Sequence, residues 1–170
     1  MIIKPDNGED GIGQVVIPPG SDLNYILDIT NESPFIRNGD AVVEEYIEAD
    51  TQIGSPSVEY RIKGEEIEYL YSCKQVVNQN RTFLGVDVGH EVLPQRVKTQ
   101  MLQSGNAFAH ALLQLGYRGF FDIDFIMSKE QKLYAVEANL RRTGATHQKK
   151  SLIYKKIYIK DYPKLYNLIR

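Results

Sequence analysis

Two neighbouring segments in which apolar and polar residues alternate constrain the fold more than any other feature of this sequence. Apolar residues take every second position, at Phe121, Ile123, Phe125 and Met127, and then at Tyr134, Val136 and Ala138. A period of two places successive side chains on opposite faces of a β-strand. The polar stretch Ser128–Lys132 between the segments predicts a turn. We therefore expect two antiparallel strands, residues 121–127 and 133–139.

The rest of the chain mixes further strands with few helices. Short strands are predicted at residues 2–3, 15–17, 41–43 and 82–86, and a hairpin at 58–71. One helix is expected after Asp22, a good N-cap, and a longer one runs from Pro94 to the stop at Gly116. Helices and strands do not alternate strictly. The sequence predicts an α+β fold, mainly antiparallel sheet with packed helices.

Two details of these elements call for a structural explanation. Ala41, Val42 and Val43 form an apolar run that we interpret as a buried strand. Gly105 interrupts the long helix, where glycine costs about 1 kcal/mol relative to alanine. The sequence gives no reason for a glycine at that position.

Composition excludes several classes of function. Lys and Arg number 20 against 22 Asp and Glu, so no overall positive field attracts nucleic acid or an anionic membrane. The one cysteine, Cys73, rules out an internal disulfide framework and is expected to be a buried residue of a cytoplasmic protein. No apolar run reaches the roughly 20 residues that span a bilayer, so neither nucleic acid nor a membrane is an expected partner.

Acidic side chains gather on one face of the two alternating strands. Asp122 and Asp124 share a face of the first strand, and Glu137 and Asn139 share a face of the second. A turn centred between residues 130 and 131 would place Asp124 opposite Glu137 and Asp122 opposite Asn139. A slip of one residue would separate them.

Like charges directly opposite one another destabilise a strand pair unless a proton or a cation intervenes. The carboxylates of Asp124 and Glu137 and the amide oxygen of Asn139 are hard ligands that suit Mg²⁺ or Mn²⁺. The alternative is a solvated polar face on which the acids bind nothing. The pattern alone leaves both interpretations open.

Basic residues follow directly after this acidic face. Arg141 and Arg142 are either counter-ions of the carboxylates or ligands for an anionic substrate or phosphate. His147 lies near them in sequence and is interpreted as structural rather than catalytic.

A second set of candidate residues lies at the start of the chain. Lys4 is followed by a loop containing Gly8, Gly11 and Gly13, whose backbone N–H groups can approach an anion. Lys4 would add a positive charge beside phosphates. The loop lacks the Gly-Lys-Ser/Thr ending of a Walker motif, and a plain hairpin turn is the alternative.

In their order and spacing these segments resemble the ATP-grasp superfamily. The resemblance rests on Ile3–Pro5 with the glycine loop, on Val42–Ile47, and on an acid followed 13 and 15 residues later by Glu and Asn, as in Asp124, Glu137 and Asn139. D-alanine–D-alanine ligases show the same segments. The peptide-ligase branch of pheganomycin biosynthesis is more similar, at Ser55–Val58, Gln75, Asp122–Phe125 and Glu137–His147.

The resemblance implies a C-terminal portion of an ATP-grasp enzyme, without its N-terminal part. Residues 1–150 would bind nucleotide and metal, and residues 151–170 form a tail of unknown role. The implied activity is that of an ATP-dependent carboxylate–amine, peptide-type ligase that forms an acylphosphate. Its partners would be small-molecule or peptide carboxylates and amines. Tyrosines in the tail, at Tyr154, Tyr158, Tyr162 and Tyr166, would pack on the missing domain or on a second copy in a homo-oligomer.

The resemblance also implies a role for each site residue. Arg141 and Lys4 would be catalytic, and Asp124, Glu137 and Asn139 would hold Mg²⁺. Arg142 and Asp122 would contact substrate. ATP would be bound by Lys4, Gly8, Gly11, Gly13, Glu44, Tyr46 and Ile47. Two alternatives remain, a non-catalytic ATP-binding regulatory module and another ATP-grasp activity such as a carboxylase.

Overall fold

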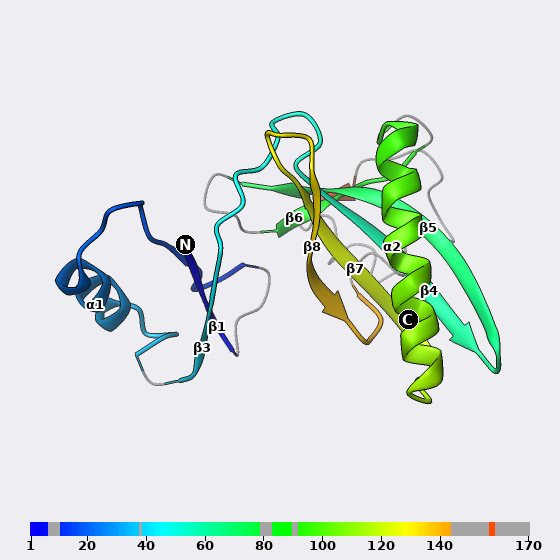
Figure 1. Cartoon of the computed structure of the whole chain (residues 1–170), viewed down its shortest axis with the longest axis horizontal. Coiled ribbons are helices and arrows are strands. Elements are labelled where there is room, and N and C mark those ends of the chain that lie inside the picture. Colours follow the sequence, from blue (N-terminus) through cyan, green and yellow to red (C-terminus); the bar gives the residue numbers. More distant parts are fainter. Residues whose placement is uncertain (7–10, 38, 79–82, 90–91, 144–156, 159–170) are drawn as a thin grey trace. The chain divides into compact units, whose positions relative to one another are not determined.

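A computed structural model describes residues 1–6, 11–37, 39–78, 83–89, 92–143 and 157–158 (Figure 1). The chain divides into two compact units, which we describe separately. One unit contains residues 1–47 and 77–83, and the other contains residues 48–76 and 84–170. His147 and most of the 151–170 tail lie outside the described residues.

The N-terminal unit is built on a small antiparallel sheet with strand order β2-β1-β3. Its elements are β1 (Ile2–Pro5), β2 (Val15–Val16), α1 (Leu23–Glu32) and β3 (Ala41–Glu44). Asp22 is the N-cap of α1, and its Oδ1 accepts a hydrogen bond of 2.8 Å from the backbone N–H of Tyr25. The cap satisfies a donor that the first helical turn leaves unpaired, as the sequence predicts.

The prediction of a buried strand at residues 41–43 is wrong. β3 forms as expected, but Val42 and Val43 are 53% and 60% exposed. Neighbouring strand residues point to opposite faces, so neither face of β3 is covered at this point. Strand pairing with β1 covers only one backbone edge of β3, and among the described residues nothing buries its two faces at this point.

The second unit is a six-stranded sheet with one long helix. The strand order is β8-β7-β4-β5-β6-β9, and β4 pairs antiparallel with both β5 and β7. The elements are β4 (Ser55–Lys63), β5 (Glu66–Val77), β6 (Phe83–Asp87), α2 (Gln95–Gln114), β7 (Gly119–Met127), β8 (Leu133–Asn139) and β9 (Ile157–Tyr158). The α+β fold with mainly antiparallel sheet is confirmed.

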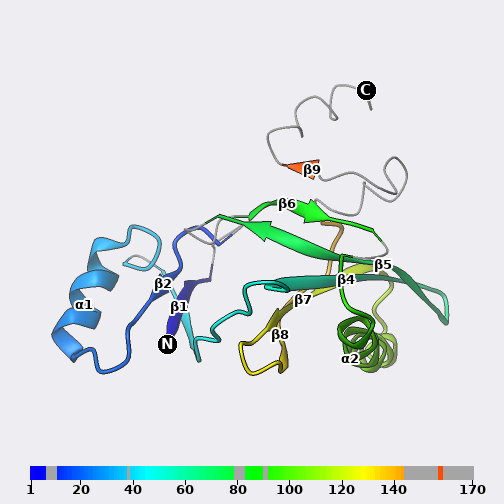
Figure 2. The ribbon, with the colours of Figure 1, turned by 90° about the horizontal axis from the view of Figure 1, so that it is seen from above.

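Helix α2 covers one face of this sheet and forms the hydrophobic core with it (Figure 2). The four alternating apolar positions of β7 belong to this core, at Phe121, Ile123, Phe125 and Met127. The buried residues of α2 recur at helical spacing, at Val97, Met101, Gly105, Ala109 and Leu112. The acidic positions of β7 therefore lie on the other face. In the described part of the chain, no helix is long and apolar enough to cross a membrane.

Gly105 is explained by the approach of α2 to the sheet. A Cβ atom at this position would lie 2.5 Å from Cε2 of Tyr60 and 2.8 Å from its hydroxyl oxygen. Tyr60 is fully buried and its ring stacks on Phe121 with centroids 5.4 Å apart, so it has little room to move. Glycine lets the helix backbone contact the tyrosine ring directly.

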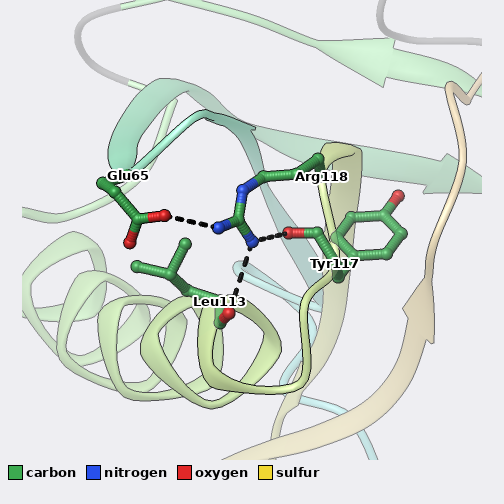
Figure 3. A network of polar contacts seen from close by, with 4 residues as sticks. All are labelled: Glu65, Leu113, Tyr117 and Arg118. Atoms are coloured by element: carbon green, nitrogen blue, oxygen red, sulfur yellow. Dashed lines mark hydrogen bonds and ion pairs between the residues drawn. The ribbon is translucent and has the colours of Figure 1, made fainter.

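Arg118 ties the end of α2 to the hairpin between β4 and β5 (Figure 3). Its guanidinium donates to the carbonyl oxygens of Leu113 and Tyr117, at 3.3 and 2.8 Å, and pairs with Glu65 at 2.7 Å. Leu113 lies in the last turn of α2, where a positive charge is favourable to the helix end.

Candidate functional site

The sheet face opposite α2 carries buried polar side chains on two central strands. Asp122 and Asp124 of β7 are only 6% and 9% exposed. On β4, Glu59 lies opposite Asp122 and Ser57 lies opposite Asp124. Charged residues are rarely buried to this extent unless something compensates them. These two aspartates are therefore not exposed residues of a solvated polar face.

The predicted register of β7 and β8 is confirmed at the acidic positions. Asp124 pairs with Glu137, and Asp122 pairs with Asn139. The register shifts by one residue between Asp124 and Phe125, that is, between the acidic positions and the loop that joins β7 to β8. This β-bulge brings the four polar side chains to one region of the sheet face.

The Asp124 carboxylate is held by hydrogen bonds from three other strands of the sheet. Nε2 of Gln75, on β5, donates to Oδ1 at 2.7 Å, and Nδ2 of Asn139 lies 3.4 Å from Oδ2. Ser57 also hydrogen-bonds this carboxylate. Asp124 is thereby oriented from both sides of β7.

Burial is the main electrostatic influence on both aspartates. It raises the pKa of Asp122 to about 7, and the nearby charge of Asp124 adds to the effect. Burial also raises the pKa of Asp124 to about 6; the Ser57 hydrogen bond opposes this shift and the Glu137 charge adds to it. Burial destabilises the charged form of both acids, and a bound cation would offset that effect.

The donor set fits a hard divalent cation. Oδ1 of Asp122 is buried and has no hydrogen-bond partner among the described residues, so one acceptor next to the predicted ligands is unsatisfied within that part of the chain. The predicted ligands are oxygens of Asp124, Glu137 and Asn139, which suit Mg²⁺ or Mn²⁺. No group of three or more His, Cys, Asp or Glu side chains placed to hold a metal is found among the described residues. The metal site, with its one amide ligand, stays a prediction.

The two arginines after β8 have different surroundings. The Cζ atom of Arg142 lies 4.4 Å from the ring centroid of Phe120, a cation–π distance. Arg141 acts on the acids at longer range, since its charge lowers the pKa of Asp124. The effect of Arg141 on Asp124 agrees with the counter-ion interpretation, whereas Arg142 packs on an aromatic ring. Their roles toward a substrate stay predictions.

In the N-terminal unit, the structure brings together two residues to which the resemblance gives different roles. Nζ of Lys4 lies 2.6 Å from Oε2 of Glu44, joining adjacent strands of the small sheet. Lys4 was expected at phosphates, and Glu44 at the adenine with Tyr46 and Ile47. The ion pair fixes the lysine side chain near the end of β3. None of these nucleotide contacts is tested by the geometry.

The glycine loop connects β1 and β2, which pair as an antiparallel hairpin. Gly11 and Gly13 have φ angles of 79° and 81°, a conformation that favours glycine. A Cβ atom on Gly13 would lie 2.8 Å from Phe35. The backbone conformation thus explains why glycine occupies these two positions, in agreement with the hairpin alternative. A phosphate-binding role of the loop stays a prediction. Gly8 lies outside the described residues.

Sequence reasoning missed several polar residues of this face. Glu59 is 1% exposed, and its Oε2 accepts a hydrogen bond of 2.6 Å from the hydroxyl of Tyr71 on β5. Burial and the adjacent Glu59 charge raise the pKa of Tyr71. The signal was present, because Glu59 is a charged residue between Val58 and Tyr60 in an apolar strand.

Comparisons with known proteins agree with this fold. The sequence matches the ATP-grasp domain family over residues 1–145. The L-propargylglycine–L-glutamate ligase of Streptantibioticus cattleyicolor is 30% identical over 107 residues, which cover 63% of this chain and 21% of that protein.

Two solved structures resemble the chain in fold. One is N5-carboxyaminoimidazole synthetase from Staphylococcus aureus in complex with ADP, with a TM-score of 0.64 and 19% identity. The other is biotin carboxylase from Campylobacter jejuni, with a TM-score of 0.69 and 18% identity. The similarity covers 86% and 89% of this chain but only 35% and 33% of those chains. The chain thus spans about a third of the length of these two structures.

Proposed function

The chain belongs to the ATP-grasp domain family, and from that premise we propose that it is the ATP- and magnesium-binding portion of a carboxylate–amine ligase. The observation that carries the proposal is the acidic face, where Asp124 stands opposite Glu137 and next to Asn139. The 30% identity to a ligase that acts on L-propargylglycine and L-glutamate supports amino acids or peptides as the substrate class.

In the proposed activity, ATP is the substrate that activates a carboxylate. Lys4 and the backbone N–H groups of the glycine loop bind its phosphates, and residues 44–47 hold the adenine. A carboxylate oxygen of the second substrate attacks the γ-phosphorus, which gives an acylphosphate and ADP. An amine then displaces phosphate from the acyl carbon and forms the C–N bond.

The residues of the acidic face would hold the cation and position the reacting groups. Asp124, Glu137 and Asn139 would bind Mg²⁺, which when bound neutralises charge on the phosphates. Arg141 follows β8 and its charge is felt at Asp124, so a developing oxyanion beside the cation site lies within its influence. Arg142 and Asp122 would contact the carboxylate or amine substrate.

A phosphate-release assay on the whole protein tests the proposal. We expect ATP cleavage that requires both a carboxylate, such as an amino acid, and an amine. Nucleotide binding without turnover in any mixture would indicate a regulatory module. Turnover that requires bicarbonate and not the amine would indicate a carboxylase, and either result would contradict the ligase assignment.

A further inference from the structure

Gln75 reaches across the sheet from β5 to the carboxylate of Asp124 on β7. The intervening strand, β4, presents only the small Ser57 side chain at that level, opposite Asp124. Nε2 of Gln75 therefore donates to Oδ1 of Asp124 at 2.7 Å, across the face of β4. The contact joins residues 49 positions apart in the sequence.

A second hydrogen bond agrees with the orientation of the Gln75 amide that Asp124 requires. Oγ of Ser55, directly opposite Gln75 on β4, donates to Oε1 of the amide at 2.9 Å. An ionised carboxylate can only accept hydrogen bonds, so the amide nitrogen is the end that suits Asp124. With its nitrogen on Asp124, the amide can accept the serine hydroxyl through its oxygen. Asp124 alone selects this orientation, because a serine hydroxyl can donate or accept. Oγ of Ser55 also lies 3.1 Å from the carbonyl oxygen of Phe125, a second acceptor for its single hydrogen.

The two oxygens of the Asp124 carboxylate therefore have different contacts. Gln75 occupies Oδ1 at a short, charge-assisted distance, whereas the contact from Asn139 to Oδ2 is long, at 3.4 Å. Oδ2 also lies on the β8 side, where Glu137 stands opposite Asp124. Gln75 therefore orients the carboxylate through Oδ1, and Ser57 also hydrogen-bonds this carboxylate. Oδ2, with the longer contact, is the oxygen on the side where a cation could also reach Glu137.

The geometry points to Gln75 as a positioning residue for the cation site, with Ser55 acting through Gln75. This inference rests on the proposed function, since it assumes that Asp124 is a ligand. Partners that orient a ligand side chain commonly change metal affinity 10- to 100-fold when they are removed. Gln75 itself touches no reacting atom.

The test measures binding of Mn²⁺ to the whole protein in the presence of a non-hydrolysable ATP analogue. Enhancement of water-proton relaxation reports the protein-bound ion. We expect the Gln75→Met variant, similar in size and without the amide, to bind Mn²⁺ about 10- to 100-fold more weakly. Ser55→Ala should weaken binding less. The exposed Gln103→Met variant on α2 is the matched control and should bind like the wild type.

The double variant separates positioning from general loss of stability. If Ser55 acts only through Gln75, the Gln75→Met and Ser55→Ala double variant binds Mn²⁺ no more weakly than Gln75→Met alone. Wild-type Mn²⁺ affinity in Gln75→Met, or fully additive losses in the double variant, would overturn the inference. Thermal unfolding without metal shows whether each variant remains folded.

Failure of the inference differs from failure of the proposed function. If Glu137→Gln loses Mn²⁺ and Gln75→Met retains it, the cation site stands and the role of Gln75 is wrong. If the wild type itself gives no relaxation enhancement, the proposed function fails and the inference fails with it.

Discussion

Asp124 and Glu137 stand directly opposite one another on β7 and β8, although the strands nearer the loop run in a different register. Phe125 pairs with Ala135, whereas an unshifted register would pair it with Val136. The bulge at this point inserts one residue into β8 between the loop and the site. The acidic pair therefore depends on the bulge, a device that is common where a strand must re-aim a side chain.

Buried acids at this site make the metal-free protein less stable as the pH rises. The pKa of Asp122 is raised from 3.8 to about 7, so between those values the folded state binds more protons than the unfolded state. The free energy of unfolding then falls as pH increases through this range. At 1.36 kcal/mol per unit, the loss from Asp122 is at most about 4 kcal/mol.

Urea unfolding at pH 5 and pH 8 with a chelator measures this effect. In Asp122→Asn, which mimics the protonated acid, the difference in stability between the two pH values should shrink. The exposed Asp28→Asn variant controls for the loss of one charge. Equal pH dependence in Asp122→Asn and the wild type would show that Asp122 ionises as freely in the folded state as in the unfolded one.

Replacing Gly105 with alanine should destabilise the protein although alanine favours helices. The helix gains about 1 kcal/mol, but overpacking against the fixed Tyr60 ring costs about 1–3 kcal/mol. We expect a net loss of up to about 2 kcal/mol by chemical denaturation. Ser104→Ala, at the exposed neighbouring position, should be neutral or stabilising, and an equal effect of both variants would refute the packing argument.

Replacing Lys4 distinguishes a role of this residue in nucleotide binding from a role in stability. The pair is partly exposed, so Lys4→Gln should cost at most about 1 kcal/mol of unfolding free energy. If Lys4 binds phosphates, the same variant should lose about tenfold or more in affinity for ADP, measured by calorimetry. Lys63→Gln, in the β4–β5 hairpin, is the control. Unchanged ADP affinity in Lys4→Gln would show that this lysine does not bind the phosphates and has a structural role only.

Arg141→Ala should impair ligation more than nucleotide binding. Loss of one group that stabilises an oxyanion lowers kcat about 100- to 1000-fold in other enzymes. The dissociation constant for ADP should change by less than about threefold, because the proposed contact forms only during the reaction. Arg96→Ala, on the exposed start of α2, is the control. A parallel loss of turnover and ADP affinity would assign Arg141 to nucleotide binding instead.

Local patterns in the sequence were sufficient to predict the elements and the acidic site. Period-two alternation at residues 121–139 predicted both strands and the face that Asp124 and Glu137 share, but the bulge on which their pairing depends is not visible in the pattern. The N-cap at Asp22 and the stop at Gly116 likewise act within one turn of the helix that they end. These features follow from interactions between residues close in sequence.

Features that depend on strand order could not be predicted in this way. The bond from Gln75 to Asp124 exists because β4 lies between β5 and β7, which no local pattern specifies. The exposure of Val42 and Val43 depends on what packs on the two faces of β3, which their apolar character does not reveal. The need for glycine at position 105 depends on Tyr60, 45 residues earlier in the chain.

The most direct test of the account is calorimetric titration of the protein with a non-hydrolysable ATP analogue, with and without Mg²⁺. Wild-type protein should bind the analogue about tenfold or more tightly with Mg²⁺, and Glu137→Gln should lose this gain while retaining its fold. Glu130→Gln, in the loop of the same hairpin, is the matched control and should keep it. The same Mg²⁺ dependence in Glu137→Gln, or no nucleotide binding by the wild type, would contradict the central claim.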